Sequence, residues 1–266
     1  MFGVVPKPLW EKRIPPDAKN RIPLKMRCVL IEHRDGLVLI DTGAGNKDDA
    51  RFQEIYGLEN AGNPTALEDA IRESGHAPDD VKWVINTHLH FDHAGGNTTK
   101  REGGSIALSF PNATYVVQKG ELAFAATPNE RIRASYLPPN FQPVVDAGRL
   151  RLLEGDTDVL PDIRALVTPG HVPWHQSILI GSGEERALFL GDMCPTSAHL
   201  PAPWIMGYDV EPLVTLATKK RVLKQAADEG WMLIFEHDAT VARGKVAPDP
   251  KRGWTSDLVE RVSAPG

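Results

Sequence analysis

The sequence predicts an α/β fold in which short buried strands alternate with helices and end in polar side chains. A strand is predicted at residues 81–86, because this run is short, apolar and rich in β-branched residues. The polar segment 87–96 follows it directly. Helical patterns lie between such strands, one beginning at Asn63-Pro64-Thr65 and another at Pro212. This alternation is typical of an α/β fold.

Segment 87–96 holds three histidines and an aspartate, which are His88, His90, Asp92 and His93. Imidazole nitrogens and carboxylate oxygens are ligands that Zn²⁺ and similar cations prefer, and His-x-His places two rings side by side. Gly95 and Gly96 follow, and we expect them to adopt backbone conformations closed to other residues. The segment therefore predicts a metal site at the end of a strand.

Apolar runs and turn residues place the other elements. Asp35-Gly36 predicts a hairpin turn between the first two strands. The helix that begins at Asn63-Pro64-Thr65 is expected to end at Gly75, and a second helix is predicted at 121–126. The predicted strands are 26–32, 37–41, 81–86, 114–118, 150–153, 163–168, 176–180, 187–190 and 231–235.

The third predicted helix runs from Pro212 to Gly230, with Asp209 as a candidate N-cap before it. Apolar residues at helical spacing predict its buried face. They are Leu213, Leu216, Leu223 and Ala227. The strand 231–235 is predicted to be the last strand of the chain.

We expect one domain over residues 1–266, with an N-terminal arm at 1–25 and a charged, peripheral tail at 248–266. Prolines argue against regular structure in the arm. Its Phe2, Leu9 and Trp10 need a surface to cover, so the arm either packs on the body or forms a wall of the substrate pocket. Prolines between residues 128 and 143 mark a long irregular insertion that we expect to shape the site.

Charge and composition exclude several classes of function. A formal net charge of -5 and the lack of any run rich in Lys and Arg argue against a nucleic-acid-binding protein. Neither a signal peptide nor a membrane span is recognisable, so we expect a cytoplasmic protein that does not bind membranes. The two cysteines, Cys28 and Cys194, form no disulfide framework and are expected to pack in the interior.

Three further ligand-type side chains each stand just beyond an apolar strand. They are His171, Asp192 and His237. Open α/β sheets gather functional groups at the carboxyl ends of their strands. Together with segment 87–96, these positions predict a metal-binding protein.

This arrangement resembles the metallo-β-lactamase superfamily, whose pattern is His-x-His-x-Asp-His followed by a distant His, an Asp and a His. The resemblance covers most of the chain, including the turn Asp41-Thr42-Gly43, and implies the four-layer αββα sandwich of that family. It also implies two metal ions. The ligands that it assigns are His88, His90 and His171 on the first ion, Asp92, His93 and His237 on the second, and Asp192 bridging both.

Within the superfamily, the chain is similar to the quorum-quenching N-acyl homoserine lactonases and their methyl parathion hydrolase relatives. The similarity rests on His-Leu-His-Phe-Asp-His-Ala-Gly, on the arm Phe2-Gly3-Val4-Val5-Pro6-Lys7, and on a stretch from Gly191 to Asp209. Antibiotic-cleaving members usually have cysteine in place of Asp192 and are exported, which disfavours a β-lactamase. The resemblance implies that His175 supports the metal site without binding the metal itself. Trp174 stands where many members have glycine, and we expect it to narrow the entrance.

The predicted function is hydrolysis of a lactone or a carboxylic ester. Two cations about 3.5–4 Å apart would share a bridging hydroxide at neutral pH, with Asp92 helping to shuttle the proton. Hydrolysis of a phosphotriester or phosphodiester is the alternative, because the same ions can clamp charge on a phosphoryl oxygen. A metal-binding protein without turnover is a third interpretation. Zn is the expected metal, with Mn, Fe or Co also suited, and a homodimer is left open.

One lactonase branch has a tyrosine three residues after the bridging aspartate, where this chain has Pro195. Proline has no proton to donate to a leaving alkoxide. We expect Tyr208 or His199 to replace it, and favour Tyr208 because a phenol donates without carrying positive charge beside two cations. In the alternative interpretation, Tyr208 only packs under its loop and His199 is solvated.

Overall fold

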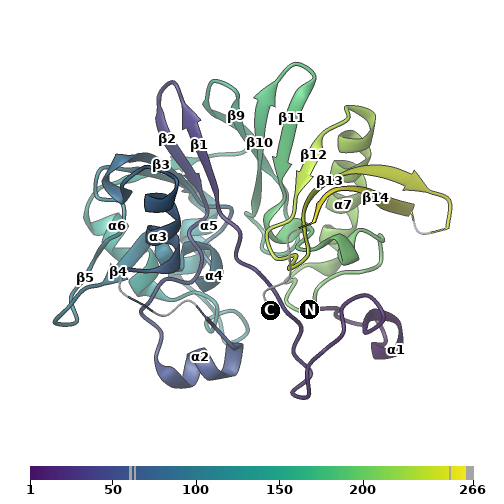
Figure 1. Cartoon of the computed structure of the whole chain (residues 1–266), viewed down its shortest axis with the longest axis horizontal. Coiled ribbons are helices and arrows are strands. Elements are labelled where there is room, and N and C mark those ends of the chain that lie inside the picture. The colour runs from purple at the N-terminus through teal and green to yellow at the C-terminus, as the bar shows by residue number, and fades with distance from the viewer. Residues whose placement is uncertain (60–61, 63, 252, 262–266) are drawn as a thin grey trace. The chain divides into compact units, whose positions relative to one another are not determined.

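The computed structural model describes residues 1–59, 62, 64–251 and 253–261, which fall into two compact units (Figure 1). The terminal unit joins Met1–Lys25 to Gly155–Gly266, and the middle unit is Met26–Glu154. Asn63 of the predicted helix start lies outside the described residues, as do residues 252 and 262–266 of the predicted tail. The single domain stays a prediction.

The middle unit is built on a five-stranded sheet of order β1-β2-β3-β6-β7. The hairpin predicted at Asp35-Gly36 joins β1 and β2, while β2, β3, β6 and β7 run parallel. Val84 and Ile85 of β3 are fully buried, as is typical of a parallel strand. The strands are β1 Val29–His33, β2 Gly36–Ile40, β3 Val81–Ile85, β6 Thr114–Gln118 and β7 Leu150–Leu153, with a separate pair, β4 Thr98–Lys100 and β5 Ile106–Leu108.

Helix α3 of the middle unit begins where the sequence predicts. Thr65 accepts a hydrogen bond from the Glu68 backbone N–H, and the Glu68 carboxylate accepts one from the Thr65 N–H. Helix α2 is absent from the sequence prediction, because it buries no residue and shows no apolar stripe. The helices of this unit are α2 Ala50–Tyr56, α3 Ala66–Glu73, α4 Phe91–Ala94, α5 Lys119–Ala126 and α6 Gln142–Asp146.

The terminal unit is built on a seven-stranded sheet of order β14-β13-β12-β11-β10-β9-β8. Strands β9 and β11 are both antiparallel to β10, and β12 is parallel to β11. The carboxyl ends of β9, β11 and β12 therefore meet at the same edge of the sheet. The strands are β8 Thr157–Leu160, β9 Ile163–Val167, β10 Gln176–Ser182, β11 Glu185–Phe189, β12 Met232–Ile234, β13 Val241–Asp249 and β14 Gly253–Arg261.

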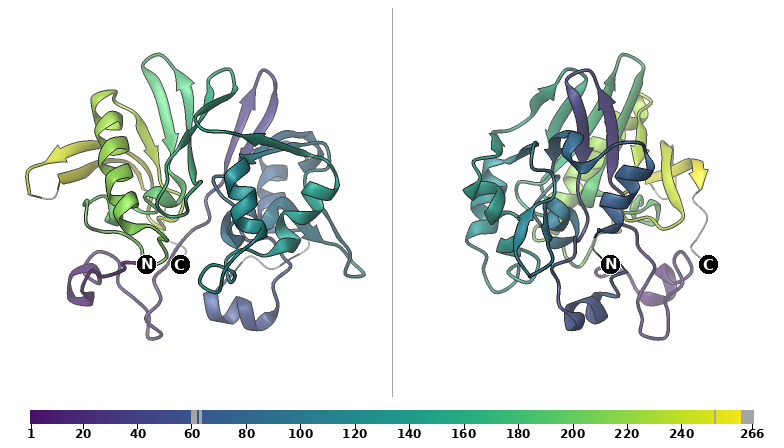
Figure 2. Two further views of the ribbon diagram at one scale, coloured as in Figure 1. Left: turned by 180° about the vertical axis from the view of Figure 1, so that it is seen from behind. Right: turned by 60° about the vertical axis from the view of Figure 1, so that its left-hand side comes forward.

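The prediction that 231–235 is the last strand is wrong, because the long β13–β14 hairpin follows β12 (Figure 2). Charged residues and Gly244 interrupt the apolar pattern of β13, which hides the strand in the sequence. Strand β8 is also missing from the prediction. Its four residues are too few for a clear alternation of apolar and polar side chains.

Helix α7 (Pro212–Asp228) lies along this sheet and packs on it through the apolar residues of its second half (Figures 1 and 2). The predicted buried face is wrong for its beginning, because Leu213 is 78% exposed. Thr215, Thr218 and Lys219 are buried instead. These polar side chains hydrogen-bond to backbone carbonyl groups, which allows their burial.

The N-terminal segment contains one helical turn, α1 (Lys7–Trp10), where the sequence predicts no regular structure. At its other end, Leu24 forms an antiparallel bridge with Asp238, and the Lys25 N–H donates to the carbonyl of His237. Residues that are 212 positions apart in the chain thus pair with one another.

The predicted α/β class is confirmed, because each unit combines helices with a sheet of its own. Within the described residues, no helix has both the length and the apolar character needed to cross a membrane.

Candidate active site

Asp41 anchors the loop that carries the candidate ligands of the middle unit. It directly follows β2, the strand that pairs with β3, and the loop of interest directly follows β3. The buried carboxylate of Asp41 accepts two hydrogen bonds of 2.7 Å from Thr87, one from its backbone N–H and one from its hydroxyl. These bonds hold the loop where it leaves the sheet.

Thr87 and Asp41 also hold a proton on Nδ1 of two histidine rings. The Thr87 hydroxyl gives its single proton to the carboxylate, so it accepts from Nδ1 of His88, 3.0 Å away. Nδ1 of His93 lies 3.1 Å from Oδ2 of Asp41 and donates to it. When neutral, both rings therefore present a lone pair at Nε2, which is the form that binds a metal.

Glu121, which follows β6, holds the backbone between the first two histidines. Its Oε1 accepts from the Leu89 N–H at 2.9 Å and from the Tyr136 hydroxyl at 2.8 Å. The Tyr136 ring packs on His90, with 4.6 Å between ring centroids. Tyr136 lies in the predicted irregular insertion, so the expectation that this insertion shapes the candidate site is confirmed within the middle unit.

Gly95 and Gly96 are needed for close packing and not for an unusual backbone. Gly95 has a φ of -59°, and neither glycine is among the residues with positive φ, so their predicted conformations are wrong. A Cβ on Gly95 would lie 2.2 Å from the Ala44 carbonyl oxygen, and one on Gly96 would lie 2.1 Å from that of Thr42. The close approach lets the Thr42 N–H donate to the His93 carbonyl at 2.7 Å. The turn after β2 thereby supports the ligand loop.

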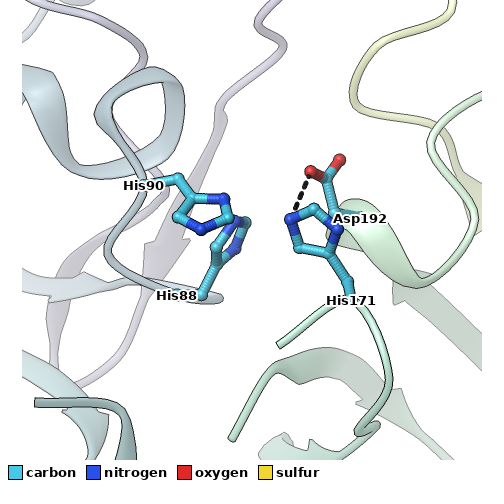
Figure 3. A group of neighbouring side chains, drawn as sticks. All are labelled: His88, His90, His171 and Asp192. Atoms are coloured by element: carbon cyan, nitrogen blue, oxygen red, sulfur yellow. Dashed lines mark ion pairs between the residues drawn. The ribbon is translucent and has the colours of Figure 1, made fainter. Parts of the chain in front are cut away.

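His171, Asp192 and His237 of the terminal unit follow β9, β11 and β12, as the sequence predicts. The Asp192 carboxylate lies between the two rings: Oδ2 is 3.0 Å from Nε2 of His171, and Oδ1 is 3.0 Å from Nε2 of His237. Figure 3 draws the first of these contacts. It also draws His88 and His90 of the middle unit, whose ring centroids are 4.5 Å apart.

The two rings beside Asp192 are also held through Nδ1. Nδ1 of His171 lies 3.0 Å from Oδ1 of Asp209, and Nδ1 of His237 lies 2.6 Å from the carbonyl oxygen of Lys25. Both oxygens are acceptors, so both rings donate from Nδ1. The structure thus corrects the prediction that Asp209 is an N-cap: Glu211 occupies that position in α7, and Asp209 orients a histidine.

This donor set fits a divalent metal. With the proton of each neutral ring on Nδ1, the lone pair at Nε2 faces an oxygen of Asp192 at 3.0 Å. Two such acceptors repel each other unless a cation or a proton lies between them. Imidazole rings held from behind by carboxylate and carbonyl oxygens, with Nε2 facing a further carboxylate, are the usual surroundings of a zinc-type site.

His175 supports Asp192 through a directed chain of hydrogen bonds. Its Nε2 accepts from the Asp192 N–H at 3.1 Å, so its Nδ1 donates to the Thr168 hydroxyl at 2.8 Å. The Thr168 hydroxyl then donates to Ser177 Oγ at 3.0 Å, and Ser177 donates to the Leu190 carbonyl at 2.9 Å. This series of hydrogen bonds begins at the Asp192 N–H and ends at the Leu190 carbonyl, so it holds the turn that carries Asp192. The predicted supporting position of His175 is confirmed.

Asp238 is a further buried carboxylate, which sequence reasoning missed. It accepts from the N–H and hydroxyl of Ser197 and from the N–H groups of Thr240 and Val241. Burial alone would raise the pKa of Asp238, but these hydrogen bonds outweigh it and hold the pKa below its usual value. Through its hydrogen bonds to Ser197, the ionised Asp238 carboxylate joins the loop after β12 to the loop after Asp192. Asp238 directly follows a predicted ligand, but no short-range pattern reveals its partners.

Tyr208 and His199 lie in the loop between Asp192 and α7, in contrasting surroundings. Tyr208 is 60% exposed. His199 is buried, and burial lowers its pKa to about 3, with the Lys219 charge adding to the effect. Its Nε2 donates to the Met1 carbonyl, and its Nδ1 accepts from the Thr196 hydroxyl at 2.7 Å. A solvated His199 is therefore excluded, and the catalytic role of either residue stays a prediction.

The N-terminal arm packs on this loop within the terminal unit. Phe2 is 4% exposed and stacks on His199, with 4.6 Å between centroids, and on Trp10, at 5.2 Å. Trp204 meets the Phe2 ring edge-on at 5.6 Å. The packing interpretation of the arm is confirmed for Phe2 and Trp10 and is wrong for Leu9, which is 54% exposed. The use of the arm as a pocket wall stays a prediction. Trp174 is 43% exposed.

Residues 25–237 match the family model described as the metallo-beta-lactamase superfamily. The chain belongs to the metallo-β-lactamase superfamily. The match begins at Lys25, directly before the middle unit, and ends at the last predicted ligand, His237, and thus includes all seven predicted ligands. The resemblance inferred from the ligand motif is confirmed.

Relatives within this superfamily narrow the class. An N-acyl homoserine lactonase of Bacillus cereus is 29% identical over 242 residues, which are 86% of this chain and 88% of the relative. The crystal structure of a probable metal-dependent hydrolase from Staphylococcus aureus has a TM-score of 0.87 at 29% identity, over 99% of this chain and 92% of that one. An N-acyl homoserine lactone hydrolase, solved with N-hexanoyl-L-homoserine at its catalytic metal centre, has a TM-score of 0.63 at 27% identity, over 81% and 82% of the two chains. This superfamily member is a metal-dependent hydrolase.

Proposed function

We propose that the protein opens lactones, and N-acyl homoserine lactones in particular, with the help of two divalent metal ions. The observation that carries the proposal is the Asp192 carboxylate, whose two oxygens each lie 3.0 Å from the Nε2 of a different histidine. A carboxylate that faces two imidazoles in this way is suited to bridge two cations. The lactonases among its relatives support the substrate class.

The proposed ligands are predominantly neutral imidazoles with carboxylates, a set that suits Zn²⁺ and also Mn²⁺, Fe²⁺ or Co²⁺. When bound, two such ions would supply a shared hydroxide at neutral pH and positive charge for the oxygen on which charge develops. The proposed assignment is His88, His90 and His171 for one ion, Asp92, His93 and His237 for the other, and Asp192 for both.

Among the remaining groups, Asp92 is proposed to move the proton, because its side chain is 28% exposed and can exchange protons with solvent. Tyr208 is proposed to protonate the leaving alkoxide. Tyr208 is 60% exposed and so can meet a substrate, whereas His199 is buried inside the terminal unit. His199 is also neutral at pH 7, with a pKa of about 3, and so carries no proton in excess.

The test compares three substrates on protein loaded with metal: an N-acyl homoserine lactone, an activated aryl ester and a phosphotriester. We expect the lactone to have the highest kcat/KM and elemental analysis to find two ions per chain. A higher kcat/KM for the phosphotriester would replace the proposed substrate class with the alternative. Tight metal binding without turnover of any of the three would support a metal-binding protein that is not an enzyme.

A cytoplasmic location and a homodimer stay predictions from the sequence.

A further inference from the structure

Lys219 is a buried lysine in the middle of α7, with 1% of its surface exposed. Its ammonium group lies 2.5 Å from the carbonyl oxygen of His199, 3.1 Å from that of Pro201 and 2.7 Å from that of Trp204. All three acceptors belong to one loop, which begins after Asp192 and ends at α7. Lysine is among the residues least often buried, so a burial this deep calls for a specific role.

The three acceptors also define the charge of Lys219. A backbone carbonyl can only accept, so three contacts of hydrogen-bond length need three N–H donors. A neutral amine has two, and the ammonium has three. Burial lowers the pKa of Lys219, but the carbonyl dipoles and the nearby Asp209 favour the charged form. Lys219 therefore acts as a cation tethered to α7 that binds the loop through its backbone oxygens.

The same face of α7 holds a second loop. Thr218, beside Lys219, donates its hydroxyl proton to the carbonyl of Pro169 at 2.8 Å. Thr215 lies one turn earlier, and Gly170 packs so closely on it that a Cβ there would lie 2.4 Å from the Thr215 nitrogen. Residues at i, i+3 and i+4 share one face of a helix. This polar face thus holds the loop that carries His171 as well as the loop after Asp192.

We propose that Lys219 is a positioning residue for the reaction, holding the loop after Asp192 in the form that presents Asp209 to His171 and Tyr208 to the substrate. The part that concerns Tyr208 rests on the proposed function. The part that concerns Asp209 rests on its contact with His171 of 3.0 Å. Without the ammonium, three carbonyl groups, two of them in buried hydrogen bonds, would lose a donor, and the loop would exchange its closed form for ones that satisfy these groups with water.

The test substitutes Lys219→Met, which keeps the length of the side chain and removes the three N–H donors. Lys220→Met is the matched control, because the next residue of the same helix is exposed. Lys219→Gln is the graded variant, since its amide restores two N–H donors. Two quantities are measured on metal-loaded protein: hydrogen exchange of the backbone amides of residues 196–209, and kcat and KM for the lactone.

We expect Lys219→Met to speed exchange in residues 196–209 about tenfold or more, while exchange in β10 stays unchanged. We expect kcat to fall about tenfold with a smaller change in KM, because a displaced proton donor affects the transition state more than binding. Lys219→Gln should lie between wild type and Lys219→Met in both measurements, and it replaces the latter if the methionine variant does not fold. Lys220→Met should match wild type.

Unchanged exchange in residues 196–209 would show that Lys219 does not hold the loop, and would overturn the proposal. Faster exchange with unchanged kcat would overturn it as well, because the loop would then be held without consequence for the reaction. If wild type and Lys220→Met turn over an ester or a phosphotriester but no lactone, the proposed substrate has failed instead. The kcat comparison is then made on the substrate that wild type hydrolyses.

Discussion

Nδ1 of His171 and Oδ1 of Asp209 are 3.0 Å apart, and both side chains are buried. This hydrogen bond keeps the proton of His171 on Nδ1. Asp209→Ala should therefore weaken metal binding about 10- to 100-fold, as is usual when a partner behind a metal ligand is lost. Asp209→Asn keeps an oxygen acceptor and should lose less. Competition with a chelator measures the affinity, and equal metal affinity in all three proteins would contradict the expectation.

Asp192→Ala should reduce kcat/KM more than about 100-fold and lower the metal content below two ions per chain. The physical reason is that one carboxylate is proposed to hold both cations. Elemental analysis beside the lactone assay checks both effects. A variant, or a wild-type preparation, that is fully active with one ion per chain would remove the binuclear assignment.

Tyr208→Phe should cut kcat/KM for an alkyl lactone about 10- to 100-fold, which corresponds to roughly 1.4–2.7 kcal/mol of transition-state stabilisation. An aliphatic alkoxide leaves poorly without a proton, whereas an activated phenolate leaves unaided. The aryl ester should therefore barely respond. Equal losses on both substrates would indicate disturbed packing, and no loss on either would return the role to His199 or to the metal ions.

The acyl chain of the lactone should contribute to binding. Trp174 is 43% exposed and offers apolar surface near the proposed ligand His171 in the sequence. If it covers the chain, kcat/KM should rise with acyl length by at most about fourfold per methylene, the limit set by about 0.8 kcal/mol for each buried CH₂. Trp174→Ala should flatten this rise. A series from short to long acyl chains that shows no trend would rule out an apolar pocket.

Gly96→Ala should destabilise the protein by about 1–3 kcal/mol, because its Cβ would lie 2.1 Å from the Thr42 carbonyl oxygen in a tightly packed turn. Gly207→Ala is a suitable control, since its Cβ would meet its nearest neighbour at 3.5 Å, an ordinary contact. Urea unfolding of both variants measures the difference. Equal free energies of unfolding for the two variants would show that the turn after β2 can shift to accept the added Cβ without loss of stability.

The ends of the strands were the predictable part of the site. Buried strands are short apolar runs, so the positions after them can be read directly, and His171, Asp192 and His237 all follow a strand in the structure. Their partners were not predictable. Asp209 lies 38 residues from His171, and Lys25 lies 212 residues from His237, separations at which no periodicity relates two side chains. Asp209 resembled a helix start because it stands shortly before Pro212, and the sequence does not show that its partner is the distant His171.

The polar face of α7 was hidden because helix patterns are interpreted by hydrophobicity. Leu213 fits an apolar stripe but is exposed, and Lys219 fits a solvated face but is buried. What decides their environment is the set of backbone carbonyls that the neighbouring loops present, which the sequence of the helix does not contain. Gly95 and Gly96 are a second example. Only glycine fits there because the backbone of Ala44 and Thr42, which are distant in the sequence, packs against them.

The division of the chain has a consequence for the order in which the nascent protein matures. The middle unit, Met26–Glu154, is continuous and can fold while the ribosome is still translating the rest. Met1–Lys25 precedes the middle unit in the chain, yet its unit is completed by Gly155–Gly266, so this segment can pack only after the later residues have been translated. Only then does the Lys25 carbonyl reach His237 and set its tautomer. We therefore expect the proposed binding of metal by His237 to follow translation of both parts of the terminal unit.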